Sequence, residues 1–354
     1  MIDDLNKIKV LHVLRSNKYS GAENVAITII QNVKKKSKDI ELIYVCPEGP
    51  IEQKLKKENV KYEMIKNFSL KEIKRVMQKY SPDVIHAHDF TAGFFCSLLK
   101  KKEKLIFHIH SNYEWMKKLC FKSLVFLYSA KRSDVVLTVS NSIEEDSFFK
   151  SAVKNKIFMI GNPIDTKKII EKSNEFVVNS SYDIISCGRL SPYKAPLETL
   201  DIFLKLKKRN TNIRLCYIGD GELRKELETK IKEFNLEASV ELLGFKDNPY
   251  PYLKQSKVLC MPSKAEGFGL AAVEALTLGI PVVSSNVGGL IDIVTEKCGK
   301  NCVKTEEYVN EMEKLLVDEE YYKMKSIEAG KRAEELDNFE EYINNILKLY
   351  GVNK

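Results

Sequence analysis

Two glutamates, Glu266 and Glu274, bracket a glycine-rich turn in the segment EGFGLAAVE. The turn follows the apolar run KVLCMP, and residues 270–278 read as a helix that Gly279 and Pro281 end. A strand, a glycine turn and a helix N-terminus together present backbone N–H groups to a phosphate. A carboxylate beside that phosphate would repel it, whereas carboxylates accept hydrogen bonds from sugar hydroxyls. The segment therefore indicates a ligand with a diphosphate between two polyols, which describes a nucleotide-sugar.

Each glutamate alone has a simpler explanation. Glu266 could be an acid favoured at a helix start, and Glu274 could be a surface helix residue. A second loop, GRLSPYKAP at residues 188–196, follows the apolar run YDIIS and holds Arg189 and Lys194. Two cations at the end of a strand can bind a diphosphate and stabilise a leaving group. The alternative for them is an ordinary pair of solvated surface cations.

Two more glycine loops follow predicted strands, YSGAEN at residues 19–24 and IGDGE at residues 218–222. Gly21 would let the backbone approach a ligand closely and would open a helix. A single glycine turn is weak support for a ligand site, and the same holds for the second loop.

All five histidines lie in the first 110 residues, in the runs KVLHVL, DVIHAH and KLIFHIH. A period of two places His86 with His88, and His108 with His110, on one side of a strand. We expect His12, His88 and His110 at strand ends facing a cleft, and His86 and His108 buried and hydrogen-bonded. A metal site is the alternative for this group. The chain has no Asp-x-Asp stretch, which argues against metal-held nucleotide-sugar chemistry.

Apolar, β-branched runs alternate with amphipathic helical stretches along the whole chain of 354 residues. This alternation predicts parallel sheets covered by helices on both faces. The length and the two sets of runs predict two Rossmann-like domains in tandem, with a boundary near GNPIDTKK at residues 161–168. Open parallel sheets bind ligands beyond the carboxyl ends of their strands, so the cleft between two such domains is the expected site.

The charge is unevenly spread along the chain. Residues 1–162 carry 29 lysines and arginines against 18 aspartates and glutamates, a net charge of +11, and the rest of the chain carries −3. A basic half suggests a surface that meets anions, such as a membrane face or nucleic acid, with a solvated lysine-rich surface as the alternative. Residues 115–132 mix aromatics with lysines, which fits either a membrane-surface helix or a core helix with a charged edge.

The cysteines and the hydropathy point to one compartment. The eight cysteines are scattered through apolar runs, as expected for free thiols in a reducing environment, and the pair Cys298 and Cys302 alone is weak support for a metal. No window is apolar enough to span a bilayer, and the first residues lack the pattern of a signal peptide. We expect a cytoplasmic protein, peripheral at the inner face of the cell membrane if membrane contact occurs.

Taken together, these motifs resemble the retaining GT-B glycosyltransferases of family four, also called glycosyl transferase group 1. EGFGLAAVE matches the family's E-x7-E motif, and GIPVVSSNVGG at residues 279–289 matches the sequence that follows it. GRLSPYK, SGAE, VIHAHD, FHIHS and DVVLTVSNS match other family segments. The resemblance covers essentially the whole chain.

The resemblance implies a GT-B fold, α/β, with two Rossmann-like domains facing a central cleft. Residues 1–163 would be the acceptor domain and residues 164–337 the nucleotide-sugar donor domain, with the helix at 338–354 packing back on the first. The implied catalytic residues are His110, Arg189, Lys194 and Glu266. The implied donor-binding residues are Gly21, Gly188, Leu243, Gly244, Phe268, Gly269, Leu270 and Glu274.

The resemblance also implies transfer with retained anomeric configuration, no metal or other cofactor, and uracil as the commonest base. We therefore expect a sugar to move from a nucleotide-sugar, such as a UDP-sugar, to a saccharide or lipid-linked saccharide in the synthesis of a cell-surface polysaccharide. An anionic membrane surface is a further expected partner and nucleic acid is not, because the lysines are dispersed and no recognition motif accompanies them.

Two departures from the family pattern bear on activity. Ser20 stands where a glycine is usual, and Ala195-Pro196 follows Lys194 where glycine or asparagine is common. Proline is tolerated in a helix's first turn, so we expect activity to survive. The alternatives are a catalytically inactive accessory subunit and a nucleotide-sugar epimerase. An inactive relative is expected to have lost a charged site residue, and all of them are present here.

Overall fold

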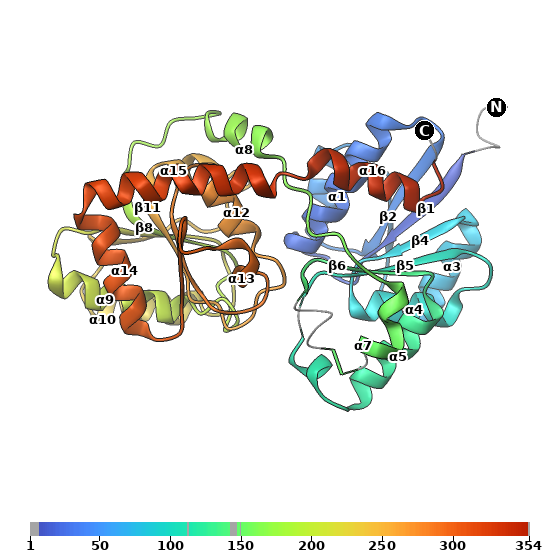
Figure 1. Ribbon diagram of the computed structural model, residues 1–354. Helices are drawn as coiled ribbons and strands as arrows, with labels where there is room; N and C mark the ends of the chain where they lie inside the picture. The colour runs from blue at the N-terminus through green and yellow to red at the C-terminus, as the bar shows by residue number, and fades with distance from the viewer. Residues whose placement is uncertain (1–6, 112, 142–146, 149, 353–354) are drawn as a thin grey trace. The chain divides into compact units, whose positions relative to one another are not determined.

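The computed structural model describes residues 7–111, 113–141, 147–148 and 150–352. The chain forms two compact units (Figure 1). Unit 1 consists of Met1–Pro163 with Asn338–Lys354, and unit 2 consists of Ile164–Asp337. The chain thus leaves unit 1 once and returns to it with its last helix.

Unit 1 is built on a parallel sheet of seven strands in the order β3-β2-β1-β4-β5-β6-β7. Its strands are β1 (Ile8–Val13), β2 (Ile40–Pro47), β3 (Tyr62–Ile65), β4 (Val84–Ala87), β5 (Lys104–Ile109), β6 (Val135–Thr138) and β7 (Ile157–Met159). Successive residues of a strand point to opposite faces, so Val10 belongs to one apolar cluster and Leu11 to the other. Both faces are therefore buried, which explains the continuous apolar runs.

Helices cover the two faces of this sheet (Figure 1). They are α1 (Gly21–Lys36), α2 (Ile51–Lys57), α3 (Leu70–Tyr80), α4 (Phe90–Leu99), α5 (Phe121–Arg132), α7 (Lys150–Val153) and α16 (Phe339–Leu349), with short 3-10 turns η1 (Glu114–Lys117) and η2 (Lys154–Lys156). The last helix, α16, contacts α1 and buries one apolar stripe that includes Tyr342, Ile343 and Ile346 in the same cluster as β1 and β2.

Unit 2 has a parallel sheet of six strands in the order β10-β9-β8-β11-β12-β13. The strands are β8 (Tyr182–Cys187), β9 (Leu215–Ile218), β10 (Val240–Leu242), β11 (Ser256–Met261), β12 (Val282–Ser285) and β13 (Gly299–Cys302). Its helices are α8 (Thr166–Ser173), α9 (Pro196–Arg209), α10 (Arg224–Glu233), α11 (Tyr250–Lys254), α12 (Leu270–Thr277), α13 (Leu290–Ile293), α14 (Thr305–Val317) and α15 (Glu319–Leu336). Separate apolar clusters lie on the two faces of the sheet, so this unit is also a Rossmann-like layer structure.

The structure differs from the sequence-based expectation at a few elements. The strands β3 and β13 were not predicted; both are short and lie at a sheet edge, where an apolar run is not required. The stretch at residues 115–132 is not one helix, because the 3-10 turn η1 and the helix α5 are separated around Cys120. Among the described residues, no helix is long and apolar enough to cross a membrane.

Candidate active site

The loop after β8 in unit 2 carries both predicted cations. Gly188 has a φ of +149°, and Ala195, just before α9, has a φ of 51° in the left-handed region. A left-handed backbone favours glycine or asparagine, which gives a physical reason why those residues are common at the position of Ala195 in the family. Pro196 is the first residue of α9, where its missing N–H costs nothing.

Lys194 and Glu266 join the two predicted motifs. The ammonium of Lys194 donates a hydrogen bond to the carboxylate of Glu266, and the two form an ion pair. The side chains are 30% and 12% exposed, so the pair is shielded but still reachable from solvent. A backbone bond of 2.8 Å from the N–H of Lys264 to the carbonyl of Tyr193 ties the same two loops together.

An open pocket of about 280 Å³, partly solvent, lies at the carboxyl ends of β8 and β11. It is lined by Ser186, Cys187, Gly188, Arg189, Leu190, Lys194, Pro196, Cys260, Met261 and Ser263. Arg189 is 64% exposed and lies 3.6 Å from a carboxylate oxygen of Glu222. This pair is too solvated to hold Arg189 firmly, so its guanidinium is available to a ligand.

The turn of EGFGLAAVE leaves a helix start open. Gly269 caps α12 with a φ of +114°, and a Cβ on it would lie 2.8 Å from the side chain of Leu290. The backbone N–H groups of Phe268, Gly269 and Leu270 donate to no group in the described part of the chain. Free N–H groups at a helix N-terminus attract an anion. Their position beside the Lys194–Glu266 pair fits the prediction of a phosphate there.

Paired glycines outside the predicted site hold this turn in place. A Cβ on Gly288 would lie 1.8 Å from the carbonyl oxygen of Glu266, and one on Gly289 would lie 2.3 Å from that of Phe268. The N–H of Gly289 also donates to the Glu266 carbonyl at 3.3 Å. Only residues without a side chain fit, so Gly288 and Gly289 position the turn. The signal for them was visible in the paired glycines of VVSSNVGG.

The loop IGDGE has a similar supporting role. A Cβ on Gly219 would lie 1.9 Å from the carbonyl oxygen of Gly188, and one on Gly221 would lie 2.4 Å from that of Leu190. The N–H of Gly219 donates to the carbonyl of Gly244 at 2.9 Å. These glycines thus bring the expected base-binding segment, Leu243 and Gly244, next to the loop that carries Arg189.

Glu274 lies on α12 and is partly buried. The hydroxyl of Tyr250 donates to its carboxylate at 3.1 Å. Desolvation of the carboxyl raises the pKa of Glu274 to about 7, although this hydrogen bond acts in the opposite direction. No sequence signal identified Tyr250. Burial thus leaves the carboxylate of Glu274 poorly hydrated, and the hydroxyl of a ligand would supply a hydrogen bond that water does not.

In unit 1, Gly21 begins α1, as predicted. Ser20, which stands where the family has glycine, is the N-cap residue, and its hydroxyl donates to the carboxylate of Glu23. Burial raises the pKa of Glu23. The carboxylate of Asp89 accepts from the N–H of Arg15 at 2.8 Å and caps α4. The side chain of Ser20 is thus engaged within its own helix start.

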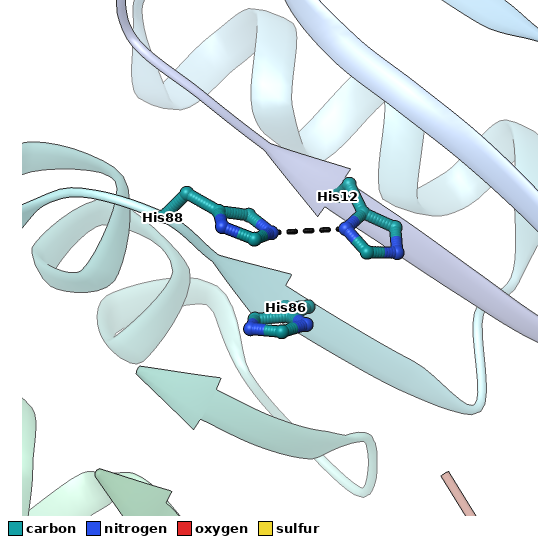
Figure 2. A group of neighbouring side chains, drawn as sticks. All are labelled: His12, His86 and His88. Atoms are coloured by element: carbon teal, nitrogen blue, oxygen red, sulfur yellow. Dashed lines mark hydrogen bonds between the residues drawn. The ribbon is translucent and has the colours of Figure 1, made fainter. Parts of the chain in front are cut away.

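His12 and His88 lie at the ends of β1 and β4, as expected, but the expectation that they face a cleft was wrong. Both are fully buried, like His86 and His108, and only His110 is partly exposed. The strands β1, β4 and β5 are neighbours in the sheet, so their histidines stack in one interior layer. Figure 2 shows three of them, with the bond of 2.9 Å between Nδ1 of His12 and Nε2 of His88.

These histidines belong to one hydrogen-bonded series, which we call the histidine chain. It runs in the order His110, His88, His12, Tyr350, His86 and His108. Tyr350 follows α16 and is fully buried under the sheet of unit 1. Its hydroxyl lies 3.1 Å from Nε2 of His12 and 2.7 Å from Nδ1 of His86, so one phenol joins two sets of imidazoles.

Burial lowers the pKa of all five histidines, for His12 and His110 to about 3. The imidazoles are therefore neutral at pH 7. Two groups of three bring their ring nitrogens within 4.8 Å of one another, His12 with His86 and His88, and His88 with His108 and His110. Either group has the spacing to hold a metal ion, but several of the same nitrogens already bond to one another.

Two family models match the chain. The model described as Glycosyl transferases group 1 matches residues 152–332, and the model described as Glycosyltransferase Family 4 matches residues 19–168. The first match contains every predicted site residue of unit 2, and the second contains Gly21 and His110. Together they span both units.

Curated relatives cover different shares of the chain. An uncharacterized glycosyltransferase of Methanocaldococcus jannaschii is 28% identical over 60% of this chain. The match spans 58% of that protein, less than two thirds of its length. A UDP-Gal:alpha-D-GlcNAc-diphosphoundecaprenol alpha-1,3-galactosyltransferase of Escherichia coli is 27% identical over 80% of this chain and 81% of its own.

Solved structures share the fold. The Anabaena protein HepE, solved in complex with UDP and glucose, has a TM-score of 0.82 and 19% identity over 98% of this chain and 100% of its own. At this identity the likeness shows the fold alone. It confirms the prediction of a GT-B fold made of two Rossmann-like domains.

Proposed function

Because the chain belongs to the family of glycosyl transferases group 1, we propose that it moves a sugar from a nucleotide-sugar to a saccharide or lipid-linked saccharide in the synthesis of a cell-surface polysaccharide. The observation that carries this proposal is the Lys194–Glu266 pair beside the free N–H groups at the start of α12. A cation, a carboxylate and an open helix N-terminus are the groups that a sugar diphosphate requires.

In the proposed complex, Arg189 and Lys194 bind the diphosphate together with the N–H groups of Phe268, Gly269 and Leu270. A bound diphosphate would attract Lys194 away from Glu266, because it carries more negative charge than one carboxylate. Glu266 would then be free to accept hydrogen bonds from the sugar hydroxyls. The ion pair thus keeps both side chains in place beside the proposed donor site.

The remaining groups would position the nucleoside and the sugar. Glu274 would accept from the ribose hydroxyls, and Leu243 with Gly244 would contact the base. His110 and Gly21 would act on the sugar and the diphosphate from unit 1, as the family resemblance implies. The catalytic effect lies in stabilising the charge that grows on the departing nucleoside diphosphate. We propose retention of configuration without a metal, with the acceptor attacking from the face that the diphosphate leaves.

The relatives support the choice of donor and acceptor. The Escherichia coli relative is named for a UDP-sugar donor and a diphosphoundecaprenol acceptor, and HepE is described with UDP and glucose. A uridine diphosphate donor and a lipid-linked acceptor are therefore the first to test on this chain.

Thermal unfolding with UDP, GDP and ADP tests the donor. We expect one diphosphate to raise the Tm by up to several degrees, since a ligand at about 100 times its Kd adds about 2.7 kcal/mol. The same ligand should not shift the variant with Lys194→Ala and Glu274→Ala, while Lys264→Ala, an exposed cation near the same turn, should behave like the wild type. No shift with any of the three would contradict the proposal and favour an accessory subunit. Sugar conversion without an acceptor would instead indicate an epimerase.

A lipid-linked acceptor would bring the protein to a bilayer, and α5 offers a suitable face. Phe121, Leu124 and Tyr128 are 80%, 48% and 44% exposed and recur at helical spacing. Leu119, just before the helix, is 61% exposed, and the exposed Lys122 lies among these apolar side chains. Apolar side chains flanked by lysines suit the surface of an anionic membrane. We propose that this face of α5 binds the membrane.

Flotation with liposomes tests this face. We expect binding to vesicles that contain anionic lipid, and weaker binding to neutral ones or at high salt. Replacing Phe121 and Leu124 with serine should lower the partition about 100-fold, since each buried side chain contributes about 1.5 kcal/mol or more. The control is Val303→Ser, a 77% exposed residue of unit 2. Wild-type protein that stays unbound at low salt would refute the membrane proposal.

A further inference from the structure

The histidine chain has more protons than hydrogen bonds. Each neutral imidazole carries one N–H, and the phenol of Tyr350 carries one O–H, so the six groups hold six protons. The five contacts between them, at 2.7 to 3.2 Å, each use one proton. One proton is left over. If all five contacts are made, three arrangements remain. Either every bond points the same way and the surplus proton lies on the outer nitrogen of His108 or of His110, or the phenol of Tyr350 accepts from both His12 and His86 and its own O–H is left over.

The two ends of the series are not equivalent. At one end, Nε2 of His108 is buried and has no partner among the described residues. At the other end, Nε2 of His110 is bonded to His88 at 3.1 Å, and its Nδ1 is left without a partner in the described part of the chain. His110 is the one member of the series that is partly exposed. Tyr350 is also buried. A buried N–H or O–H without an acceptor is rare and costly, whereas an exposed one meets water.

We propose that the histidine chain places this surplus proton on Nδ1 of His110 and so fixes the tautomer of that residue. All bonds then run from the buried end outward. Nδ1–H of His108 donates to His86, Nδ1–H of His86 donates to Tyr350, and the phenol donates to Nε2 of His12. Nδ1–H of His12 donates to His88, and Nδ1–H of His88 donates to Nε2 of His110 (Figure 2 shows the bond between His12 and His88).

This polarity gives His110 a defined chemical role, which rests on the proposed function. Its Nε2 is occupied and its Nδ1 is protonated, so neither nitrogen can remove a proton from an acceptor hydroxyl. His110 is instead a neutral hydrogen-bond donor, suited to an oxygen of the donor sugar. His88 and Tyr350 are positioning residues, which act through His110 and the series without touching the substrate.

The tautomers can be measured directly. With ¹⁵N-labelled histidine, long-range nitrogen–proton correlation distinguishes Nδ1–H from Nε2–H, and single His→Gln variants assign the five rings of this chain. Free imidazole of histidine prefers Nε2–H, so we expect a distinctive result: Nδ1–H at all five positions. Nε2–H throughout, or a mixture in the wild type, would overturn the proposal. So would one equivalent of Zn²⁺ bound by the rings, because a metal would take the nitrogens that the series uses.

Two tyrosine variants distinguish an effect of the hydrogen-bonded series from an effect of core packing. Tyr350→Phe interrupts the histidine chain. The His86–His108 pair is then left with one buried, unpartnered N–H, whichever of the two histidines donates to the other. We expect mixed tautomers at those two histidines, and unchanged Nδ1–H at His110, His88 and His12. Tyr342→Phe is the matched control, because this buried tyrosine of α16 has a hydroxyl without a partner among the described residues. Five unchanged tautomers in Tyr350→Phe would contradict the proposed series.

The outcomes for this series and for the proposed function are separable. The tautomers are measured without any ligand, so the wrong pattern overturns the histidine chain whatever the donor. Conversely, the expected pattern together with no stabilisation by UDP, GDP or ADP would contradict the donor site and leave the histidine chain intact.

Discussion

Replacing Lys194 with alanine is expected to lower turnover by about 10²–10³-fold, the loss typical of one preorganised group that stabilises transition-state charge. Lys194 lines the pocket and is held there by Glu266, and it can interact with a diphosphate that becomes more negative as the bond to the sugar breaks. The interaction strengthens in the transition state, so kcat should fall more than KM rises. The rate is measured with the nucleotide-sugar whose diphosphate stabilises the protein.

The matched control for this prediction is Lys264→Ala. Lys264 is an exposed cation near the same turn, and it pairs with Glu198 at 3.1 Å. Removing it changes the local charge by the same amount without removing a group from the pocket lining. Activity of Lys194→Ala within twofold of the wild type would rule out its assigned role. An equal loss in both variants would show a general effect of charge.

Replacing Glu274 with glutamine is expected to stabilise the protein at pH 8 and to abolish stabilisation by the nucleoside diphosphate. The pKa of Glu274 is about 7 in the folded protein, against 4.5 for an ordinary glutamate. Between these values the folded state binds more protons than the unfolded state, so this group's contribution to stability falls as pH rises. The ionised form at pH 8 therefore costs up to about 3 kcal/mol.

Glutamine cannot ionise, so the variant should gain most of this free energy at pH 8 and little at pH 4. Urea unfolding at the two pH values measures the difference, with the exposed Glu237→Gln as the control. A stabilised variant that no longer binds nucleotide would fit the pattern in which binding groups are kept at the expense of stability. If Glu274→Gln instead destabilises the protein at pH 8, ionisation of the desolvated carboxyl does not lower the free energy of unfolding as we infer.

The layered fold was predictable because it depends on local patterns. Strands buried on both faces must be apolar at every position, and residues such as Ile184 and Ile185 enter opposite clusters. The edge strands β3 and β13 were not predicted from this pattern. At an edge, pairing on one side replaces burial on both, so four residues such as Gly299–Cys302 need no apolar run.

The pocket motifs were also recognisable, but not their supports. A glycine turn before a helix is a local signal, so the segments with Lys194 and Glu266 stood out separately. Their contact depends on β8 and β11 being neighbours, although β9 and β10 lie between them in the sequence. Positions 219 and 288 require glycine because backbone atoms of distant loops lie close to them, and no local pattern reveals these contacts.

The sequence by itself determined the periodicity of the strands and helices, and it determined which side chains stand where strands end. Only the tertiary structure decided their partners. Tyr350 meets His12 across 338 positions because α16 returns to cover the sheet of unit 1, and Tyr250 meets Glu274 because α11 packs on α12. The physical reason is that strand order and helix docking are set by the burial of whole faces, which sums contributions from the entire chain, whereas periodicity records the surroundings of one segment.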